Sequence, residues 1–328
     1  MKMNTRILLI VLVSSVAAPT LASEYMLVAS TAVPGSFHPP DQWGVVLRFG
    51  FDGTGPLHPM STIPQELLSD PIGLAFNDDG DLFVGNRFAN QGDGSISRFL
   101  FDSAGDFAPG PTIIGNGLSN VHDIAFSPTG ELFATNHGSD AVSRFVFDEF
   151  GNAVPNGTIA TGFGTSYGVG FSNDGELFVA DGSTRINRYL FDPLSGAAIL
   201  NGFFDVPGSD EIRSLEFNDQ NELFIPDHDA NLVFRYVFDA LGHPIPNGTI
   251  AVPGAIGVDF SPEGEAFVAS HFVGGIQRFL FDDLGNAIPN GTIPTTSLGS
   301  IAVVEIPEPS TGLLLTTAGL FVLRRRLA

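Results

Sequence analysis

Polar side chains that could bind a ligand follow several short apolar segments of this sequence. They are Asn, Asp or Ser, several with Arg or His beside them: Asn86, Arg87, Asn136, His137, Asp181, Asp227, His228, Asp229, Ser270 and His271. Carboxylate and amide oxygens that converge suit a hard divalent cation such as Ca²⁺, which takes about six to eight oxygen ligands. We predict Asn136, Asp181 and Asp227 as metal ligands. The histidines could instead provide a general base or bind a transition metal.

A second polar set precedes other apolar segments and contains His122, Asp123, Tyr167 and Arg213. If strand ends of the first set and strand starts of the second lie on one face of the fold, the two sets meet there. The predicted ligand site then contains Asn86, Asn136, His137, Asp181, Asp227, His228, His271 and His122. The simpler alternative is that Asn and Asp at strand ends cap turns through their own backbones.

The element that must position these side chains is a strand with the pattern R-[FY]-x-F-D, which occurs six times. Its arginines are Arg48, Arg98, Arg144, Arg188, Arg235 and Arg278, spaced 50, 46, 44, 47 and 43 residues apart. Such a period indicates one repeated supersecondary unit. Strand alternation places both aromatics of a copy on one face and the Arg and Asp on the other. We expect each Arg to bond a neighbouring strand and each Asp to begin the turn that follows.

Each unit contains four short strands separated by turns, most clearly over residues 120–160. The same order recurs at residues 72–114, 166–204, 212–250 and 255–292. The first copy opens at 25–30 without its first strand, and 300–305 has the pattern of a first strand with nothing after it. Joining the two ends predicts an all-β, six-bladed propeller that leaves no open sheet edge.

The segment 71–86, with near copies at 168–181 and 257–270, resembles the six-bladed β-propellers of the NHL-repeat and gluconolactonase-like superfamily. The resemblance covers residues 24–305. It implies a mouth at one end of the ring where gluconolactonase-like relatives hold a divalent metal with Glu, Asn and Asp. Asn136, Asp181 and Asp227 offer matches to the Asn and Asp of that set, whereas no Glu opens an early first strand in the expected way.

The composition excludes some classes of partner. The chain has 36 Asp and Glu, 14 Lys and Arg, and no Cys. Five basic residues lie at the two ends: Lys2, Arg6, Arg324, Arg325 and Arg326. The acidic body between them repels nucleic acid phosphates, so we expect no nucleic acid partner. Without Cys there is neither a disulfide nor thiol chemistry.

Both ends of the chain have the patterns of targeting segments. Residues 1–22 combine a charged start, an apolar run and small residues, as in a secretory signal peptide. Residues 306–328 contain Pro307-Glu308-Pro309, a mostly apolar stretch at 312–323, and Arg324-Arg325-Arg326. This tail resembles the PEP-CTERM sorting signal of Gram-negative bacteria. The resemblance implies a short transmembrane helix as a transient anchor, processing by an exosortase, and delivery to the cell surface, outer envelope or extracellular matrix. A plain C-terminal membrane anchor is the alternative.

Two classes of function fit a propeller, 23–305, that lies between these segments. The first is an exported binding or structural module, with extracellular polysaccharide as a candidate partner, bound on the blades or on the insertion around Trp43. The second is a divalent-metal-dependent lactonase-type hydrolase that uses the mouth. The sequence favours the first, because it contains no HExxH and no phosphate-binding Gly loop.

Overall fold

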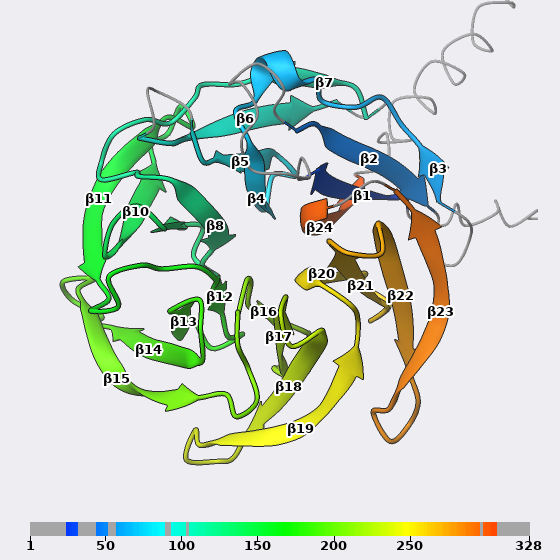
Figure 1. The fold of residues 1–328 in the computed structure, drawn as a ribbon. Helices are drawn as coiled ribbons and strands as arrows, with labels where there is room; N and C mark the ends of the chain where they lie inside the picture. The colour runs from blue at the N-terminus through cyan, green and yellow to red at the C-terminus, as the bar shows by residue number, and fades with distance from the viewer. Residues whose placement is uncertain are drawn as a thin grey trace, which may run out of the picture.

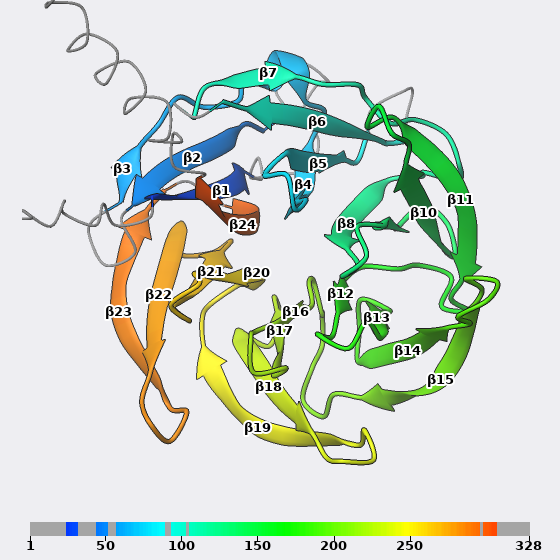
Figure 2. The ribbon, with the colours of Figure 1, turned by 180° about the vertical axis from the view of Figure 1, so that it is seen from behind.

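The computed structural model describes residues 24–31, 44–51, 57–88, 93–102, 105–295 and 298–306. Their strands form six four-stranded antiparallel sheets, which stand as blades around a common axis (Figures 1 and 2). The predicted all-β, six-bladed propeller is therefore confirmed. The described residues contain one short 3₁₀ helix, η1 (Gln65–Leu67), and no helix among them has the length and apolar character needed to cross a bilayer.

Each blade consists of four strands, which follow one another from the axis outward. Blade I has β24 (Leu298–Ile306), β1 (Glu24–Thr31), β2 (Val46–Phe51) and β3 (His58–Pro59); blade II has β4 (Pro71–Phe76), β5 (Leu82–Asn86), β6 (Ser95–Phe101) and β7 (Phe107–Pro109); blade III has β8 (Val121–Phe126), β9 (Leu132–Asn136), β10 (Ala141–Phe147) and β11 (Ala153–Ala160). Blade IV has β12 (Val169–Phe171), β13 (Leu177–Ala180), β14 (Arg185–Phe191) and β15 (Ala198–Asp205); blade V has β16 (Glu216–Phe217), β17 (Leu223–Asp227), β18 (Leu232–Phe238) and β19 (Pro244–Ala251); blade VI has β20 (Ala255–Phe260), β21 (Ala266–Ser270), β22 (Gly275–Phe281) and β23 (Ala287–Pro294).

The C-terminal strand closes the ring as predicted. β24 pairs antiparallel with β1, with Val28 opposite Ala302, and it is longer than the predicted 300–305. Ser30 ties this junction to blade II, because its hydroxyl accepts a hydrogen bond from Ser300 N at 2.8 Å and donates one to Ile72 O at 3.2 Å. Closure leaves neither the first nor the last blade with an unpaired inner strand.

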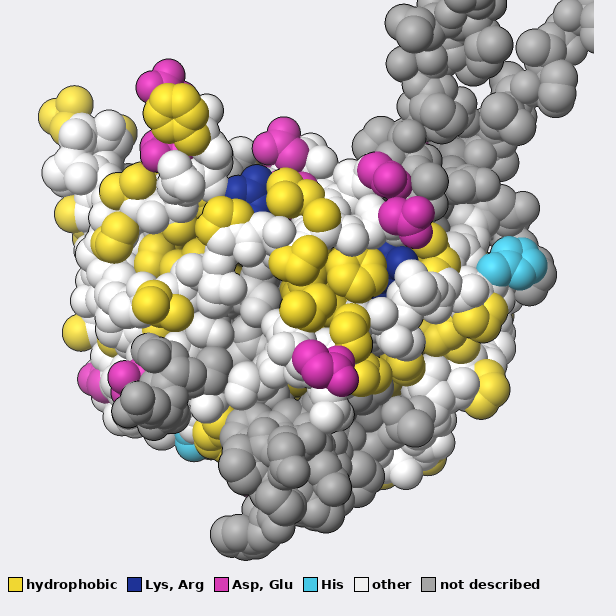
Figure 3. Space-filling view, turned by 90° about the horizontal axis from the view of Figure 1, so that it is seen from above, with side chains coloured by type: hydrophobic (Ala, Val, Ile, Leu, Met, Phe, Trp, Pro, Cys, Tyr) yellow, Lys and Arg dark blue, Asp and Glu magenta, His cyan; other side chains and the backbone are white. Residues whose placement is uncertain are grey.

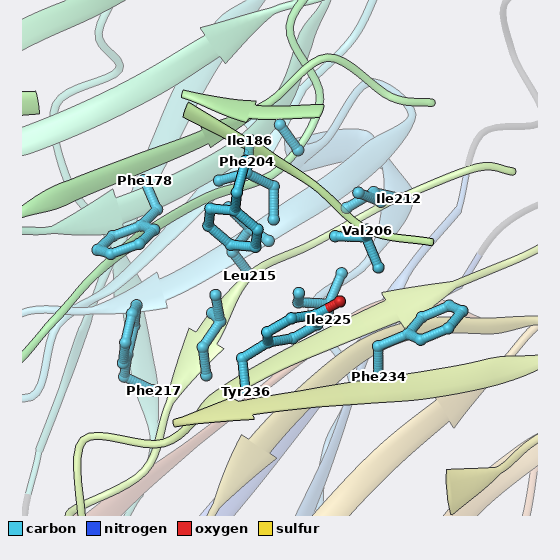
Figure 4. Packing of buried hydrophobic residues seen from close by; sticks show 12 residues of the cluster. Phe178, Ile186, Phe204, Val206, Ile212, Leu215, Phe217, Ile225, Phe234 and Tyr236 are labelled. Carbon is cyan, nitrogen blue, oxygen red and sulfur yellow. The ribbon is translucent and has the colours of Figure 1, made fainter. Parts of the chain in front are cut away.

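The hydrophobic core is divided among the contacts between adjacent blades. Between blades IV and V, the rings of Phe178 and Phe217 lie 4.9 Å apart and those of Phe204 and Tyr236 lie 5.4 Å apart (Figure 4). The aromatic residues of the repeated strand supply one side of each such cluster. Their predicted placement on one strand face is confirmed, and each buried ring contributes about 1.5–3 kcal/mol.

The repeat arginine faces the following blade and forms what we call the arginine clamp. In blade V, Arg235 Nη2 donates to Glu222 Oε2 at 2.9 Å, and Nη1 donates to Gly285 O of blade VI at 2.7 Å. The guanidinium lies over the rings of Phe224 and Phe281, with its carbon 5.2 and 5.1 Å from their centroids. Arg98, Arg144 and Arg188 repeat both hydrogen bonds. The bond to a neighbouring strand was predicted; the bond to the next blade was not.

Several predictions fall on residues that lie outside the described ranges. They are the signal peptide at 1–22, the insertion around Trp43, the motif Pro307-Glu308-Pro309, the short apolar C-terminal helix, and the cluster Arg324, Arg325 and Arg326. They stay predictions.

Candidate functional site

The two polar sets identified in the sequence meet on one face of the ring, which we call the mouth. Arg213, ahead of β16, places Nη1 3.2 Å from Nε2 of His122 on β8. His228 and His271, which follow β17 and β21, are also in contact, with 2.9 Å between Nε2 of the first and Nδ1 of the second. Inner strands therefore begin, and second strands end, on this face.

The Asn and Asp that end the second strands hold their own loops. The Oδ1 of Asn86 accepts a hydrogen bond from Ser69 N, and that of Asn136 from Ser119 N, both at 2.9 Å. Both Asn residues are buried. In each case the side chain joins the end of the second strand to the segment ahead of the first strand, which is the capping role that competed with ligand binding in the sequence.

The two aspartates predicted as metal ligands have similar partners. Asp227 is fully buried and accepts hydrogen bonds from Ser209 Oγ and from the backbone N–H groups of Asp210, Glu211 and Ala230, at 2.5–3.0 Å. Asp181 accepts from Ser183 N at 2.7 Å and Arg185 N at 3.1 Å. With the oxygens of Asn136, Asp181 and Asp227 used within their own loops, the geometry favours a structural role for this trio.

A different group brings potential metal-ligating atoms together. His228 Nδ1 lies 3.0 Å from Glu211 Oε2 and 2.6 Å from Asp229 Oδ1, and the ligand atoms of the three residues all lie within 4.8 Å of one another. It is the one such group of three among the residues that the structure describes. One imidazole and two carboxylates suit a transition metal better than Ca²⁺, which prefers an all-oxygen shell.

The two imidazoles of the mouth differ in proton affinity. The hydrogen bond to Glu211 is the main cause of a raised pKa at His228, with Asp229 adding to it. The same hydrogen bond from His228 lowers the pKa of Glu211 to about 2. Burial lowers the pKa of His271, and the charges of His228 and Arg213 lower it further. Adjacent groups whose pKa values are pushed apart are typical of acid–base sites.

Beside this pair, Arg213 organises a second cluster. Its Nη2 donates to Glu211 Oε1 at 2.5 Å, and its guanidinium lies over the Tyr167 ring with the carbon 5.3 Å from the centroid. The Tyr167 ring centroid is 4.3 Å from that of His122 and 4.9 Å from that of His137. Burial, and then the charges of Arg213 and Arg87, keep the pKa of His122 well below its usual value.

Two buried N–H groups of this cluster have no hydrogen-bond partner among the described residues. His122 accepts from Arg213 through Nε2, so its neutral ring carries the proton on Nδ1, which is one of the two; the other is Arg213 Nε. An unsatisfied buried donor costs about 1–3 kcal/mol. Neither atom is open to solvent, so a ligand would reach them only after the surrounding side chains moved.

The mouth contains two arginines that do not belong to the repeated strand, and each is paired with a carboxylate: Arg213 with Glu211 and Arg87 with Asp70. Of the nine arginines between residues 24 and 306, six belong to the repeated strand. Of the other three, Arg87 and Arg213 lie at the mouth, and Arg185 pairs with Asp205 on β15. Asp70, 2.5 Å from Arg87 Nη2, compensates part of this charge.

Sequence reasoning missed Glu211, which contacts both Arg213 and His228. Glu211 lies in the loop between β15 and β16, ahead of the strand, where repeat comparison gave no counterpart. The available signal was its position two residues before Arg213 in the same loop, because loops held by a scaffold often carry functional residues.

Three carboxyl groups lie deeper, on the inner strands. Burial raises the pKa of Asp123 and of Asp259 to about 7, and it raises that of Glu216 well above its usual value. Asp123 Oδ2 accepts hydrogen bonds from Val169 N of blade IV at 3.1 Å and from Ser214 Oγ, ahead of β16, at 3.2 Å. Asp123, which the sequence grouped with the mouth residues, therefore links blade III to the two blades that follow it.

No protein-family model and no curated protein matches this sequence. Solved structures do. The periplasmic gluconolactonase PpgL of Pseudomonas aeruginosa is 19% identical, with a TM-score of 0.62 over 87% of this chain and 100% of that chain. A candidate 6-phosphogluconolactonase of Bacteroides uniformis is 15% identical, with a TM-score of 0.64 over 86% and 100%. A catalytically inactive variant of virginiamycin B lyase from Staphylococcus aureus is 14% identical, with a TM-score of 0.50 over 84% and 86%. The fold is that of these proteins.

Proposed function

We propose that the mouth hydrolyses a lactone that carries an anionic group. The observation on which the proposal depends is the hydrogen-bonded pair His228–His271, oriented by Glu211 and Asp229 and flanked by Arg213. The similarity in fold to gluconolactonase and to a candidate 6-phosphogluconolactonase supports this alternative over a purely structural or binding module.

The carboxylates select the tautomers of the pair. When His228 is neutral, its Nδ1–H donates to Glu211 and Asp229, which leaves the Nε2 lone pair directed at His271. His271 then donates through Nδ1–H, and its own lone pair is on Nε2. This is the atom that takes a proton from water.

Hydrolysis follows from this arrangement. A water O–H bond breaks as the oxygen bonds to the lactone carbonyl carbon, and the proton goes to His271 Nε2. The Nδ1 proton of His271 passes to His228 Nε2, so the positive charge is then on the His228 ring, beside Glu211 and Asp229. The hydrogen bonds to these carboxylates raise the pKa of His228 and so stabilise that charge. The ring C–O bond then breaks, and the departing alkoxide takes the proton back along the same route.

Arg213 and Arg87 are the groups that attract the anionic part of the substrate, since each places a guanidinium at the mouth. A carboxylate or phosphate would pair with them through charge-assisted hydrogen bonds. A metal held by Glu211, His228 and Asp229 would occupy His228 Nδ1 and remove the proton that fixes the tautomer, so the relay and a metal there exclude each other.

Hydrolysis of gluconolactone and 6-phosphogluconolactone by the purified chain tests the proposal. His271→Ala is expected to lower kcat about 100- to 10,000-fold. Arg87→Gln is expected to raise KM more for the phosphorylated substrate. His243→Ala is the matched control, because His243 is exposed, pairs with Asp239 and lies in a turn on the opposite face. Full activity in His271→Ala, or activity that a chelator abolishes, would contradict the relay.

A further inference from the structure

Four turns on the face opposite the mouth each present a large apolar side chain to solvent. These side chains, which we call the apolar tips, are Phe150, Leu194, Leu241 and Leu284, and they are 79%, 96%, 81% and 87% exposed. Each lies in the turn between the third and fourth strands of blades III, IV, V and VI. A single exposed apolar residue needs no explanation, but its recurrence at the equivalent turn of four consecutive blades, beside exposed apolar residues of the outer strands, points to an interaction surface.

The turns themselves do not require an apolar residue there. In blade III, Asp148 Oδ1 accepts hydrogen bonds from Phe150 N at 2.9 Å and Asn152 N at 2.8 Å, and Gly151 supplies the positive φ of 75°. Asp192, Asp239 and Asp282 hold the other three tips through the same backbone contact. Backbone and Asp side chain fix the turn, so a polar residue would serve the fold equally well.

Apolar side chains continue from the tips along the outer strands. Cross-strand neighbours beside three tips are both exposed, namely Val146 with Val154, Leu190 with Ile199, and Leu280 with Ile288. Figure 3 shows the ring from its edge on the side of blades I and II, where apolar and acidic side chains also lie next to one another. The tips and the three cross-strand pairs form what we call the rim.

The chain leaves the propeller on this same face. Inner strands begin at the mouth, so β24 ends at Ile306 on the opposite side, where the third strands also end. The mostly apolar stretch 312–323 follows in the sequence a few residues later. Six extended residues reach at most about 20 Å. If that stretch enters a bilayer, as its sequence predicts, the tips face the same bilayer.

We propose that the apolar tips insert into the interface of a lipid bilayer with little negative charge, and that they hold the mouth away from the membrane. The rim fits this partner because the four tips end on one side of the ring and can meet a flat surface together. Asp148, Glu149, Asp282 and Asp283 flank the tips. These carboxylates disfavour anionic lipid headgroups, so binding depends on apolar insertion.

The depth of a tip in a bilayer can be measured in the full chain. We would place tryptophan at one tip, Leu284→Trp, in a Trp43→Phe background, and add phosphatidylcholine vesicles that contain brominated acyl chains. The tip tryptophan is expected to shift to shorter wavelength and to be quenched. Val273→Trp is the matched control: Val273 is 55% exposed but lies at the mouth, so its tryptophan should show neither effect.

A second measurement compares affinities. Serine at all four tips is expected to weaken binding to phosphatidylcholine vesicles roughly 100-fold. Adding phosphatidylserine should weaken binding of the unchanged chain. The proposal is overturned if the Leu284→Trp and Val273→Trp proteins are quenched alike, or if the four-serine variant loses only self-association, which would make a second copy of the chain the occupant of the rim.

Discussion

Removing the carboxylate of one arginine clamp should destabilise the propeller strongly. In Glu222→Ala, the guanidinium of Arg235 stays buried between two phenylalanine rings, with its side chain only 6% exposed. Breaking a buried ion pair by removing one partner costs about 3–5 kcal/mol. Because Nη1 keeps its bond to Gly285 O, we expect a loss at the lower end, about 3 kcal/mol. Asn247, whose Nδ2 donates to Glu222 at 2.7 Å, loses its partner too.

Urea unfolding followed by fluorescence and circular dichroism measures this loss. The matched control is Asp205→Ala, which breaks the Arg185–Asp205 pair, whose side chains are 43% and 52% exposed. Its unfolding free energy should stay within experimental error. The double variant Glu222→Met/Arg235→Met removes both charges together and should cost less than Glu222→Ala alone. Equal losses in Glu222→Ala and Asp205→Ala would refute the view that the clamp is a buried charge pair.

Three further predictions concern pH and packing. Because burial raises the folded-state pKa of Asp259 to about 7 from an ordinary value near 4, the unfolding free energy should fall as pH rises between those values, and Asp259→Asn should reduce that slope. Because the relay needs neutral His228, whose pKa is raised, kcat/KM should rise with pH through a midpoint above about 6.5, as a pH–rate profile would show. Gly73→Ala should lower the thermal midpoint, since its Cβ would lie 2.9 Å from Asp123 Cα; Gly50→Ala, where the nearest atom is Met60 Sδ at 3.6 Å, should not.

The fold could be predicted from sequence because its signals repeat. Alternation in each R-[FY]-x-F-D strand fixes which side chains enter the core, and six copies repeat that choice. The missing first strand near Tyr25 and the surplus strand at 300–305 together indicated closure. The repeat does not indicate which neighbouring blade each Arg contacts. The second hydrogen bond of Arg235, to Gly285 O, depends on how adjacent blades pack, and a single repeat contains no information about its neighbour.

The site could be predicted only in part, because one residue type serves two purposes. Asn136 and His137 are adjacent and both lie at the mouth. The side chain of Asn136, however, accepts a hydrogen bond from the loop ahead of β8, whereas the His137 ring contacts that of Tyr167. A carboxylate or amide at a strand end accepts hydrogen bonds from nearby backbone N–H groups, because each buried N–H group left unpaired costs about 1–3 kcal/mol. Sequence spacing places such residues correctly but does not distinguish a cap from a ligand-binding group.

Departures from the repeat separate these two roles better than residue type does. The clamp arginine recurs in every blade, and in blades II to V it makes the same two hydrogen bonds, so contacts within and between blades explain it. Arg87, His122 and Arg213 have no such counterparts in most blades and make no clamp. They gather at one face, where burial and then the two arginine charges lower the pKa of His122. Leu284 and its three equivalents are the converse case: they repeat, yet they are exposed and their turns are held without them. The proposed bilayer would account for a repeated residue of that kind, just as the proposed substrate would account for an unrepeated cluster.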